Sequence, residues 1–241
     1  MRDALIVFAR RPEAGRVKTR LSPPLSPEQA AGLYAAMLDD VLEVSAEAAR
    51  IHDLEMWLAV TPAGAVAEMS RRCPAGFQVF PQQGRDLSER MSRALEAAVA
   101  RGAPRILLRG SDSPSLEATR IGEALRGLVD HDVVASPDRD GGYALIGLRG
   151  AAPGIFDHPM GTERVLRDTL DAARRLGLSS DLLAGGFDID RIEDLRWLAA
   201  ARSAGRATGC PRTLDFLDAN ALWELAGLDS PGLRASGRPA R

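Results

Sequence analysis

Short apolar runs alternate along this chain with longer stretches in which apolar residues recur every three or four positions. The runs predict strands at 4–9, 54–61, 77–80, 105–110, 132–136 and 143–148. The periodic stretches predict helices at about 26–44, 63–72, 86–101, 116–129, 162–176, 190–201 and 213–227. Such alternation is typical of a mostly parallel sheet with helices on both faces. We therefore predict an α/β fold: a single-domain, three-layer α/β/α architecture.

Local signals support several of the helix starts. Three pairs have the spacing of an N-cap residue and its partner three positions on: Ser26 and Gln29, Asp86 and Glu89, and Asp190 and Glu193. In the first of them, Pro27 stands at the first helical position, where its missing N–H costs nothing. We expect a helix to begin after each of these caps.

The chain divides by composition into a main domain and a C-terminal part. Residues 1–204 carry the strand and helix alternation, and 205–228 form a predicted helical extension. Residues 229–241, rich in Ser, Pro, Gly, Ala and Arg, cannot bury a core, and we expect them to be disordered. The extension has apolar residues for docking or for a homodimer contact: Leu214, Phe216, Leu217, Leu222 and Trp223.

Composition narrows the class of protein. The 241 residues carry a net charge of −2, which argues against general affinity for a nucleic acid polymer. Two cysteines without a CxxC spacing are typical of a reduced compartment. The first apolar run is too short for a secretory signal, and no run approaches the roughly 20 residues of a membrane span. We expect a cytoplasmic protein that does not act at a membrane.

The loop after the first strand is strongly basic. Lys18 is the only lysine among 31 basic residues, which suggests a site that favours a compact ammonium over a guanidinium. Gly15 in the same loop can adopt a positive φ and let the backbone approach a ligand. The loop lacks the spacing of a Walker A motif. It is either a solvated surface loop or, as we expect from its position after a strand, a phosphate-binding loop with ligands Arg10, Gly15, Arg16, Lys18 and Arg20.

Several acids follow predicted strands, where α/β proteins collect their ligands. Asp112 directly follows the fourth strand and is a candidate ligand for Mg²⁺ or Mn²⁺, or else a cap of the next helix. Asp188 and Asp190 would share one face of an extended segment, although Asp190 is also a candidate helix cap. The stretch Asp140, Gly141, Gly142 and Tyr143 is either a plain hairpin turn or a place where a ligand approaches the backbone.

Five motifs occur in order: Phe8-Ala9-Arg10…Gly15-Arg16-Val17-Lys18-Thr19-Arg20-Leu21, Gly84-Arg85-Asp86-Leu87-Ser88-Glu89-Arg90-Met91, Gly110-Ser111-Asp112-Ser113-Pro114, Asp140-Gly141-Gly142-Tyr143 and Asp188-Ile189-Asp190…Glu193-Asp194-Leu195. Over about residues 3–200 this order resembles the DUF2064 proteins, often labelled glycosyltransferases, of the nucleotide-diphospho-sugar transferase (GT-A) superfamily. It is also similar to 2-phospho-L-lactate guanylyltransferase and to molybdenum-cofactor nucleotidyltransferases. Ser111 and Ser113 depart mildly from the family's Thr and Cys, and Ile192 replaces its usual Pro.

The resemblance implies roles by position. Arg16, Lys18 and Asp112 would be catalytic, and the loop containing Arg20 would bind the nucleotide phosphates. Asp112 would be the principal metal ligand, with Asp190, or else Asp188, as the second. The stretch from Gly84 to Arg90 would lie near the base or ribose, and 140–143 near the acceptor.

Three functions are consistent with these roles. The first is metal-dependent nucleotidyl transfer from an NTP to a small phosphorylated or hydroxyl acceptor, with release of pyrophosphate. The second is glycosyl transfer from an NDP-sugar, although a diphosphate has less need of so many cations. The third is a nucleotide-binding protein without turnover, which would be expected to have lost its metal acids, whereas Asp112 and Asp190 are both present.

Overall fold

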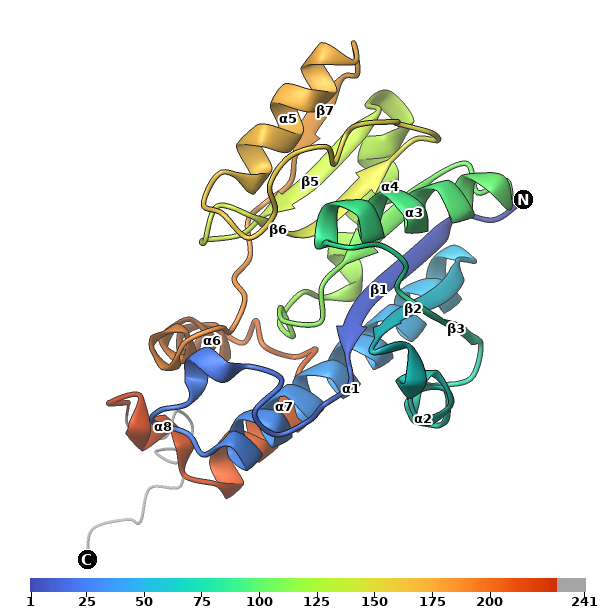
Figure 1. Ribbon diagram of the computed structural model, residues 1–241. Helices are drawn as coiled ribbons and strands as arrows, with labels where there is room; N and C mark the ends of the chain where they lie inside the picture. The colour runs from blue at the N-terminus through green and yellow to red at the C-terminus, as the bar shows by residue number, and fades with distance from the viewer. Residues whose placement is uncertain (229–241) are drawn as a thin grey trace, which may run out of the picture.

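A computed structural model shows a seven-stranded sheet between two layers of helices (Figure 1). It describes residues 1–228. The strands are β1 (Ala4–Arg10), β2 (Glu55–Thr61), β3 (Phe77–Pro81), β4 (Ile106–Arg109), β5 (Val133–Pro137), β6 (Tyr143–Leu148) and β7 (Ser180–Leu182). Their order across the sheet is β3-β2-β1-β4-β6-β5-β7, and only β6 runs antiparallel to its neighbours. The predicted mostly parallel α/β fold is confirmed.

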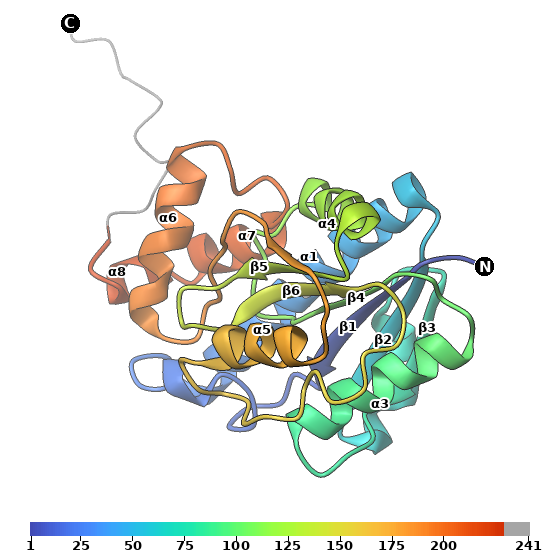
Figure 2. The ribbon, with the colours of Figure 1, turned by 90° about the horizontal axis from the view of Figure 1, so that it is seen from above.

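The helices cover both faces of this sheet. They are α1 (Pro27–His52), α2 (Val66–Arg72), α3 (Leu87–Ala100), α4 (Ala118–Asp130), α5 (Val165–Arg175), α6 (Leu195–Ser203), α7 (Pro211–Ala219) and α8 (Leu222–Leu225). Figure 2 shows α1, α4 and α7 on one side of the sheet and α3 and α5 on the other. Because helices lie on both sides, β1 is buried along almost its whole length, which explains its continuous apolar sequence.

Two of the three predicted helix starts are confirmed. The side chain of Ser26 accepts a hydrogen bond from the backbone N–H of Gln29, and Gln29 returns one to the backbone of Ser26. Asp86 caps α3 by accepting from the N–H of Glu89. The third prediction is wrong: Asp190 is not a cap. Instead the carboxylate of Asp194 accepts from the N–H groups of Asp190 and of the next residue, which leaves the side chain of Asp190 free for other contacts.

The predicted C-terminal extension packs into the same core as the main domain. Leu217, Leu222 and Trp223 are fully buried there, and α7 lies against α1. Asp40 of α1 is also fully buried and accepts hydrogen bonds from the first N–H groups of α7. The apolar face of the extension therefore docks onto its own chain. The tail predicted to be disordered, 229–241, lies outside the described residues.

The short edge strand β7 was not predicted. Its three residues are all exposed and two of them, Ser180 and Asp181, are polar, so they lack the apolar pattern of the other strands. Hydrogen bonding to β5 alone defines it.

No helix within residues 1–228 is both long enough and apolar enough to cross a membrane.

Candidate active site

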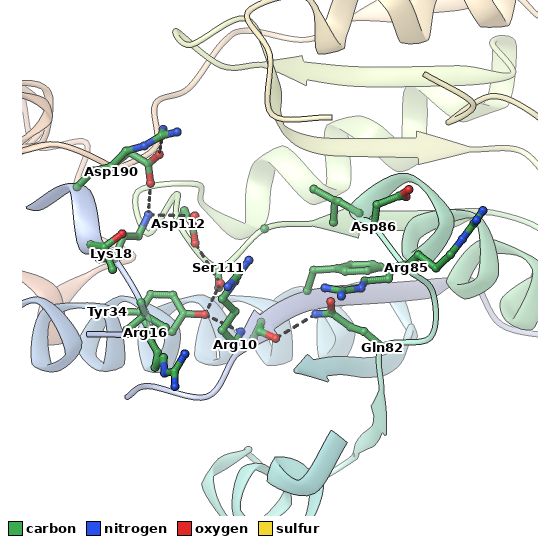
Figure 3. Close-up of a pocket in the computed structure, with 18 residues that line it drawn as sticks. Arg10, Arg16, Lys18, Tyr34, Gln82, Arg85, Asp86, Ser111, Asp112 and Asp190 are labelled. Carbon is green, nitrogen blue, oxygen red and sulfur yellow. Dashed lines mark hydrogen bonds and ion pairs between the residues drawn. The ribbon is translucent and has the colours of Figure 1, made fainter. Parts of the chain in front are cut away.

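A cleft of about 660 Å³ opens at the carboxyl ends of β1 and β4 (Figure 3). These two strands are parallel neighbours, with Val7 opposite Arg109, so the loops that follow them emerge side by side. The basic loop comes from β1 and the Asp112 loop from β4. Seven of the predicted site residues line this cleft: Arg10, Arg16, Lys18, Arg20, Arg90, Asp112 and Asp190.

Lys18 lies between two of the predicted metal ligands. Its Nζ is 3.0 Å from Oδ2 of Asp112 and 2.8 Å from Oδ1 of Asp190, and its side chain is only 4% exposed. Burial opposes the charged form, but attraction to Asp112 and Asp190 outweighs it and raises the pKa of Lys18 above its ordinary value. The ammonium therefore stays charged, and it is held in place by residues 94 and 172 positions away in the sequence.

The backbone at Lys18 adopts a left-handed conformation, with φ of 48°. This conformation is uncommon for a residue with a side chain, and it directs the chain into the short 3₁₀ turn Thr19–Leu21. Gly15 has a φ of 71°, so its predicted positive φ is confirmed, but it is not among the residues that line the cleft. Gly15 shapes the loop, and the cations beyond it reach the cleft.

Asp190 reaches the cleft from a segment between β7 and α6. The N–H of Ile189 donates to the carbonyl of Asp112 over 3.0 Å, which fixes this segment beside the β4 loop. The second carboxylate oxygen of Asp190 accepts from Arg20 over 3.1 Å. Burial alone would raise the pKa of Asp190, but Lys18 and Arg20 lower it overall. Asp190 is therefore ionised at neutral pH.

Tyr34 of α1 links the two loops, and it was not predicted from the sequence. Its hydroxyl accepts from the N–H of Arg10 over 2.9 Å and is 2.8 Å from Oγ of Ser111. Ser111 in turn donates to Oδ1 of Asp112 over 3.1 Å. This chain of hydrogen bonds orients the Asp112 carboxylate from the end of β1 (Figure 3). A lone tyrosine within an amphipathic helix gives no signal of such a role in the sequence.

A second cavity of about 420 Å³ adjoins the first and shares Arg20, Asp112 and Asp190 with it. Predicted residues Asp140, Gly142, Tyr143 and Asp188 line this second cavity, together with Asp138, which was not predicted. Asp188 thus lines the second cavity and not the cleft that contains Lys18. Burial raises the pKa of Asp188 to about 7, and the charges of neighbouring acids act in the same direction.

Asp138 holds the loops around the second cavity together. Its Oδ1 accepts from the N–H groups of Arg139 (2.8 Å) and Asp188 (3.0 Å), and its Oδ2 accepts from Ser113 over 3.4 Å. Burial raises its pKa to about 6.

Gly141 turns between β5 and β6 with a φ of 89°, and a Cβ there would come within 2.1 Å of the carbonyl oxygen of Glu163. Gly141 therefore serves close packing.

Asp112 and Asp190 line both cavities, and the atoms they offer as metal ligands are carboxylate oxygens. One oxygen of each accepts a single hydrogen bond, from Ser111 and Arg20 respectively, and the other contacts Nζ of Lys18. Within residues 1–228 no group of three or more acids, histidines or cysteines is arranged to hold a metal ion. A pair of carboxylates completed by substrate oxygens is the donor set that Mg²⁺ uses at phosphate sites, so these two residues fit such an ion.

The mostly parallel sheet and the cleft at its carboxyl edge define a nucleotide-diphospho-sugar transferase-like domain. A crystal structure of a protein from Desulfovibrio desulfuricans G20, provisionally assigned as a nucleotide-diphospho-sugar transferase, superposes on this chain with a TM-score of 0.84. It is 29% identical in sequence and covers 93% of this chain and 97% of its own.

The family model DUF2064, "Uncharacterized protein conserved in bacteria", matches residues 44–162. The chain belongs to this family. A 3-phospho-D-glycerate guanylyltransferase of Phenylobacterium zucineum (strain HLK1) is 34% identical over 184 residues, which are 73% of this chain and 81% of the relative. A 2-phospho-L-lactate guanylyltransferase of Methanothermobacter thermautotrophicus is 28% identical over 74% of this chain and 76% of its own. The predicted family and its relation to guanylyltransferases are confirmed.

Proposed function

We propose that the protein transfers a nucleotidyl group from an NTP to a small phosphorylated or hydroxyl acceptor and releases pyrophosphate. The observation that carries the proposal is the grouping of six cations and three carboxylates (Asp86, Asp112 and Asp190) in one cleft at the carboxyl edge of the sheet. Six cations line it: Arg10, Arg16, Lys18, Arg20, Arg85 and Arg90. The cations outnumber the carboxylates, and a triphosphate carries more negative charge than the diphosphate of an NDP-sugar, so it is the better match. The names of the curated relatives, which are guanylyltransferases, support the same reaction class.

In this reaction an acceptor oxygen attacks the α-phosphorus and forms a new O–P bond. The bond from that phosphorus to the bridging oxygen of pyrophosphate breaks, and negative charge grows on the leaving group. Lys18 and Arg16 are placed to stabilise this charge through fixed positive groups that need no reorganisation. When Mg²⁺ is bound, held by Asp112 and Asp190, it supplies further neutralisation of the phosphates.

The second cavity is the place we propose for the acceptor. It shares Asp112, Asp190 and Arg20 with the nucleotide cleft, so an oxygen held there would face the α-phosphorus across the shared wall. Phe8 and Leu87 also line both cavities, so apolar side chains border the place where donor and acceptor would meet. This arrangement would bring donor and acceptor together, and such positioning is a main contribution that a protein makes to phosphoryl-type transfer.

Calorimetric titration with NTPs and with NDP-sugars, each with Mg²⁺ and with EDTA, tests the proposal. We expect NTPs to bind more tightly than NDP-sugars, and to bind more tightly with Mg²⁺ than with EDTA. Asp112→Asn should remove most of the Mg²⁺ dependence while leaving the melting temperature close to that of the wild type. Tighter binding of an NDP-sugar would favour glycosyl transfer instead. Nucleotide binding that is indifferent to EDTA would favour a protein without turnover.

A further inference from the structure

One end of the nucleotide cleft is formed by Gln82, whose side chain is fixed by backbone groups. Gln82 directly follows β3, and its own N–H donates to the carbonyl of Val60 over 2.8 Å. Its side-chain Nε2 donates to the carbonyls of Ala9 (3.0 Å) and Ala59 (2.9 Å) (Figure 3). These carbonyls belong to β1 and β2, so the amide is attached to the backbone of two neighbouring strands of the sheet.

The orientation of this amide follows from its partners. Both Nε2 hydrogens are used by carbonyl oxygens, so the opposite assignment of nitrogen and oxygen would place three oxygens together without a proton. The remaining atom, Oε1, is an acceptor only, and no residue within 1–228 donates a hydrogen bond to it. Gln82 is half-buried and lines the nucleotide cleft. The cleft therefore contains one fixed acceptor that the protein does not use for its own structure.

Arg90 supplies fixed donors at the same end of the cleft. Its Nε donates to the carbonyl of Gly84 over 3.1 Å, which anchors the guanidinium at one edge. Gly84 itself has a φ of 137°, and a Cβ there would come within 2.8 Å of the backbone N of Arg90, so this loop packs directly on the start of α3. Within the described residues no carboxylate pairs with Arg90. Its two terminal amino groups remain as a pair of parallel donors.

We infer that Gln82 and Arg90 recognise the base of the bound nucleotide and that this base is guanine. The inference rests on the proposed function, because it takes the cleft to hold a nucleotide. Guanine presents two adjacent donors, N1–H and the 2-amino group, and two acceptors, O6 and N7. A carbonyl oxygen such as Oε1 of Gln82 accepts from the two donors, and a guanidinium such as that of Arg90 donates to O6 and N7 as a pair.

The other bases match this pair of groups less well. Adenine is commonly read by an amide that donates to N7 and accepts from N6, and the donors of Gln82 are already used. Uracil has a single donor between two separated acceptors, and the two parallel donors of one guanidinium cannot contact both acceptors at once. Cytosine has one donor next to two acceptors and is the strongest competitor, but it uses only one lone pair of Oε1. The curated relatives are named guanylyltransferases, which also favours guanine.

Calorimetric titration of the full chain with GTP, ATP, CTP and UTP in Mg²⁺ tests this inference. A good paired contact discriminates by about 1–3 kcal/mol, so we expect GTP to bind about 5- to 150-fold more tightly than the other three. Inosine triphosphate lacks only the 2-amino group, and 7-deaza-GTP lacks only N7. We expect each to bind several-fold more weakly than GTP. These two ligands test the contacts without altering the protein.

Variants then assign the contacts to residues. Gln82→Met should reduce the preference for GTP over inosine triphosphate to near unity. Arg90→Lys, which keeps the charge, should remove the preference for GTP over 7-deaza-GTP. Gln83→Met is the matched control, because Gln83 is adjacent and exposed, and it should keep the full preference. If Gln82→Met does not fold, equal affinity of the wild type for GTP and inosine triphosphate would still overturn the inference.

The outcomes separate this inference from the proposed function. Equal, Mg²⁺-dependent binding of all four NTPs would overturn the base assignment and leave nucleotidyl transfer standing. Tighter binding of CTP than of GTP would overturn guanine in the same way. Failure of every NTP to bind would overturn the proposed function and the base assignment together.

Discussion

Lys18→Ala is the most direct test of the site, because one substitution removes the only cation that contacts both candidate metal ligands in the described part of the chain. Two unit charges 4 Å apart interact by about 4 kcal/mol at an effective dielectric near 20. If about half of that attraction to the leaving phosphates exists only in the transition state, its loss raises the barrier by about 2 kcal/mol. We therefore expect kcat to fall by about 30-fold or more.

The fold should survive this substitution. Loss of one partner from a fully buried ion pair costs about 3–5 kcal/mol. The side chains of Asp112 and Asp190 are 41% and 35% exposed, however, so water can solvate them and the cost is smaller. We expect the circular dichroism spectrum to be unchanged. Lys18→Arg should rescue little, because a planar guanidinium does not fit between two carboxylates that hold a compact ammonium.

Steady-state pyrophosphate release, measured with an acceptor found by screening, gives kcat and KM for each variant. Arg174→Ala is the control, because Arg174 lies on α5 away from both cavities and its side chain is 77% exposed. We expect this control to keep wild-type kinetics. A folded Lys18→Ala enzyme with wild-type kcat and KM would refute the reasoning about the cleft.

Three further substitutions test the structure around the site. Asp40→Ala removes the buried cap of α7 and should lower the free energy of unfolding by about 1–3 kcal/mol, read as an earlier urea midpoint; an unchanged midpoint would show that the cap is dispensable. Asp188→Asn removes a carboxylate whose pKa is raised to about 7, so its charged form destabilises the folded protein above that pH. In EDTA the substitution should therefore raise the melting temperature at pH 8, and this gain should shrink as the pH falls below 7 and end near pH 4. A gain that does not change with pH would contradict the raised pKa. Gly141→Ala should lower the melting temperature more than Gly150→Ala, since both glycines have a positive φ but only Gly141 is crowded, by the carbonyl oxygen of Glu163; equal losses would leave backbone strain as the whole cause.

Much of the fold could be predicted from the local sequence. The apolar runs that became β1, β2 and β4 are buried by helices, so their hydrophobicity is both a local pattern and the cause of their position. The caps at Ser26 and Asp86 involve partners three residues away, within reach of a sequence pattern. The basic loop and Asp112 could be placed at one edge because the carboxyl ends of parallel strands lie together.

The tertiary structure decided what depends on contacts between distant residues. Asp190 has the spacing of a cap, but Lys18 and Arg20, more than 160 residues away, take its carboxylate, and Asp194 takes over the backbone contacts. Tyr34 and Gln82 have no local signal, because their roles come from hydrogen bonds to other strands and loops. Hydrophobic patterning records which face of an element is buried, whereas the partner of a polar side chain is set only when the chain has folded and brought both groups together.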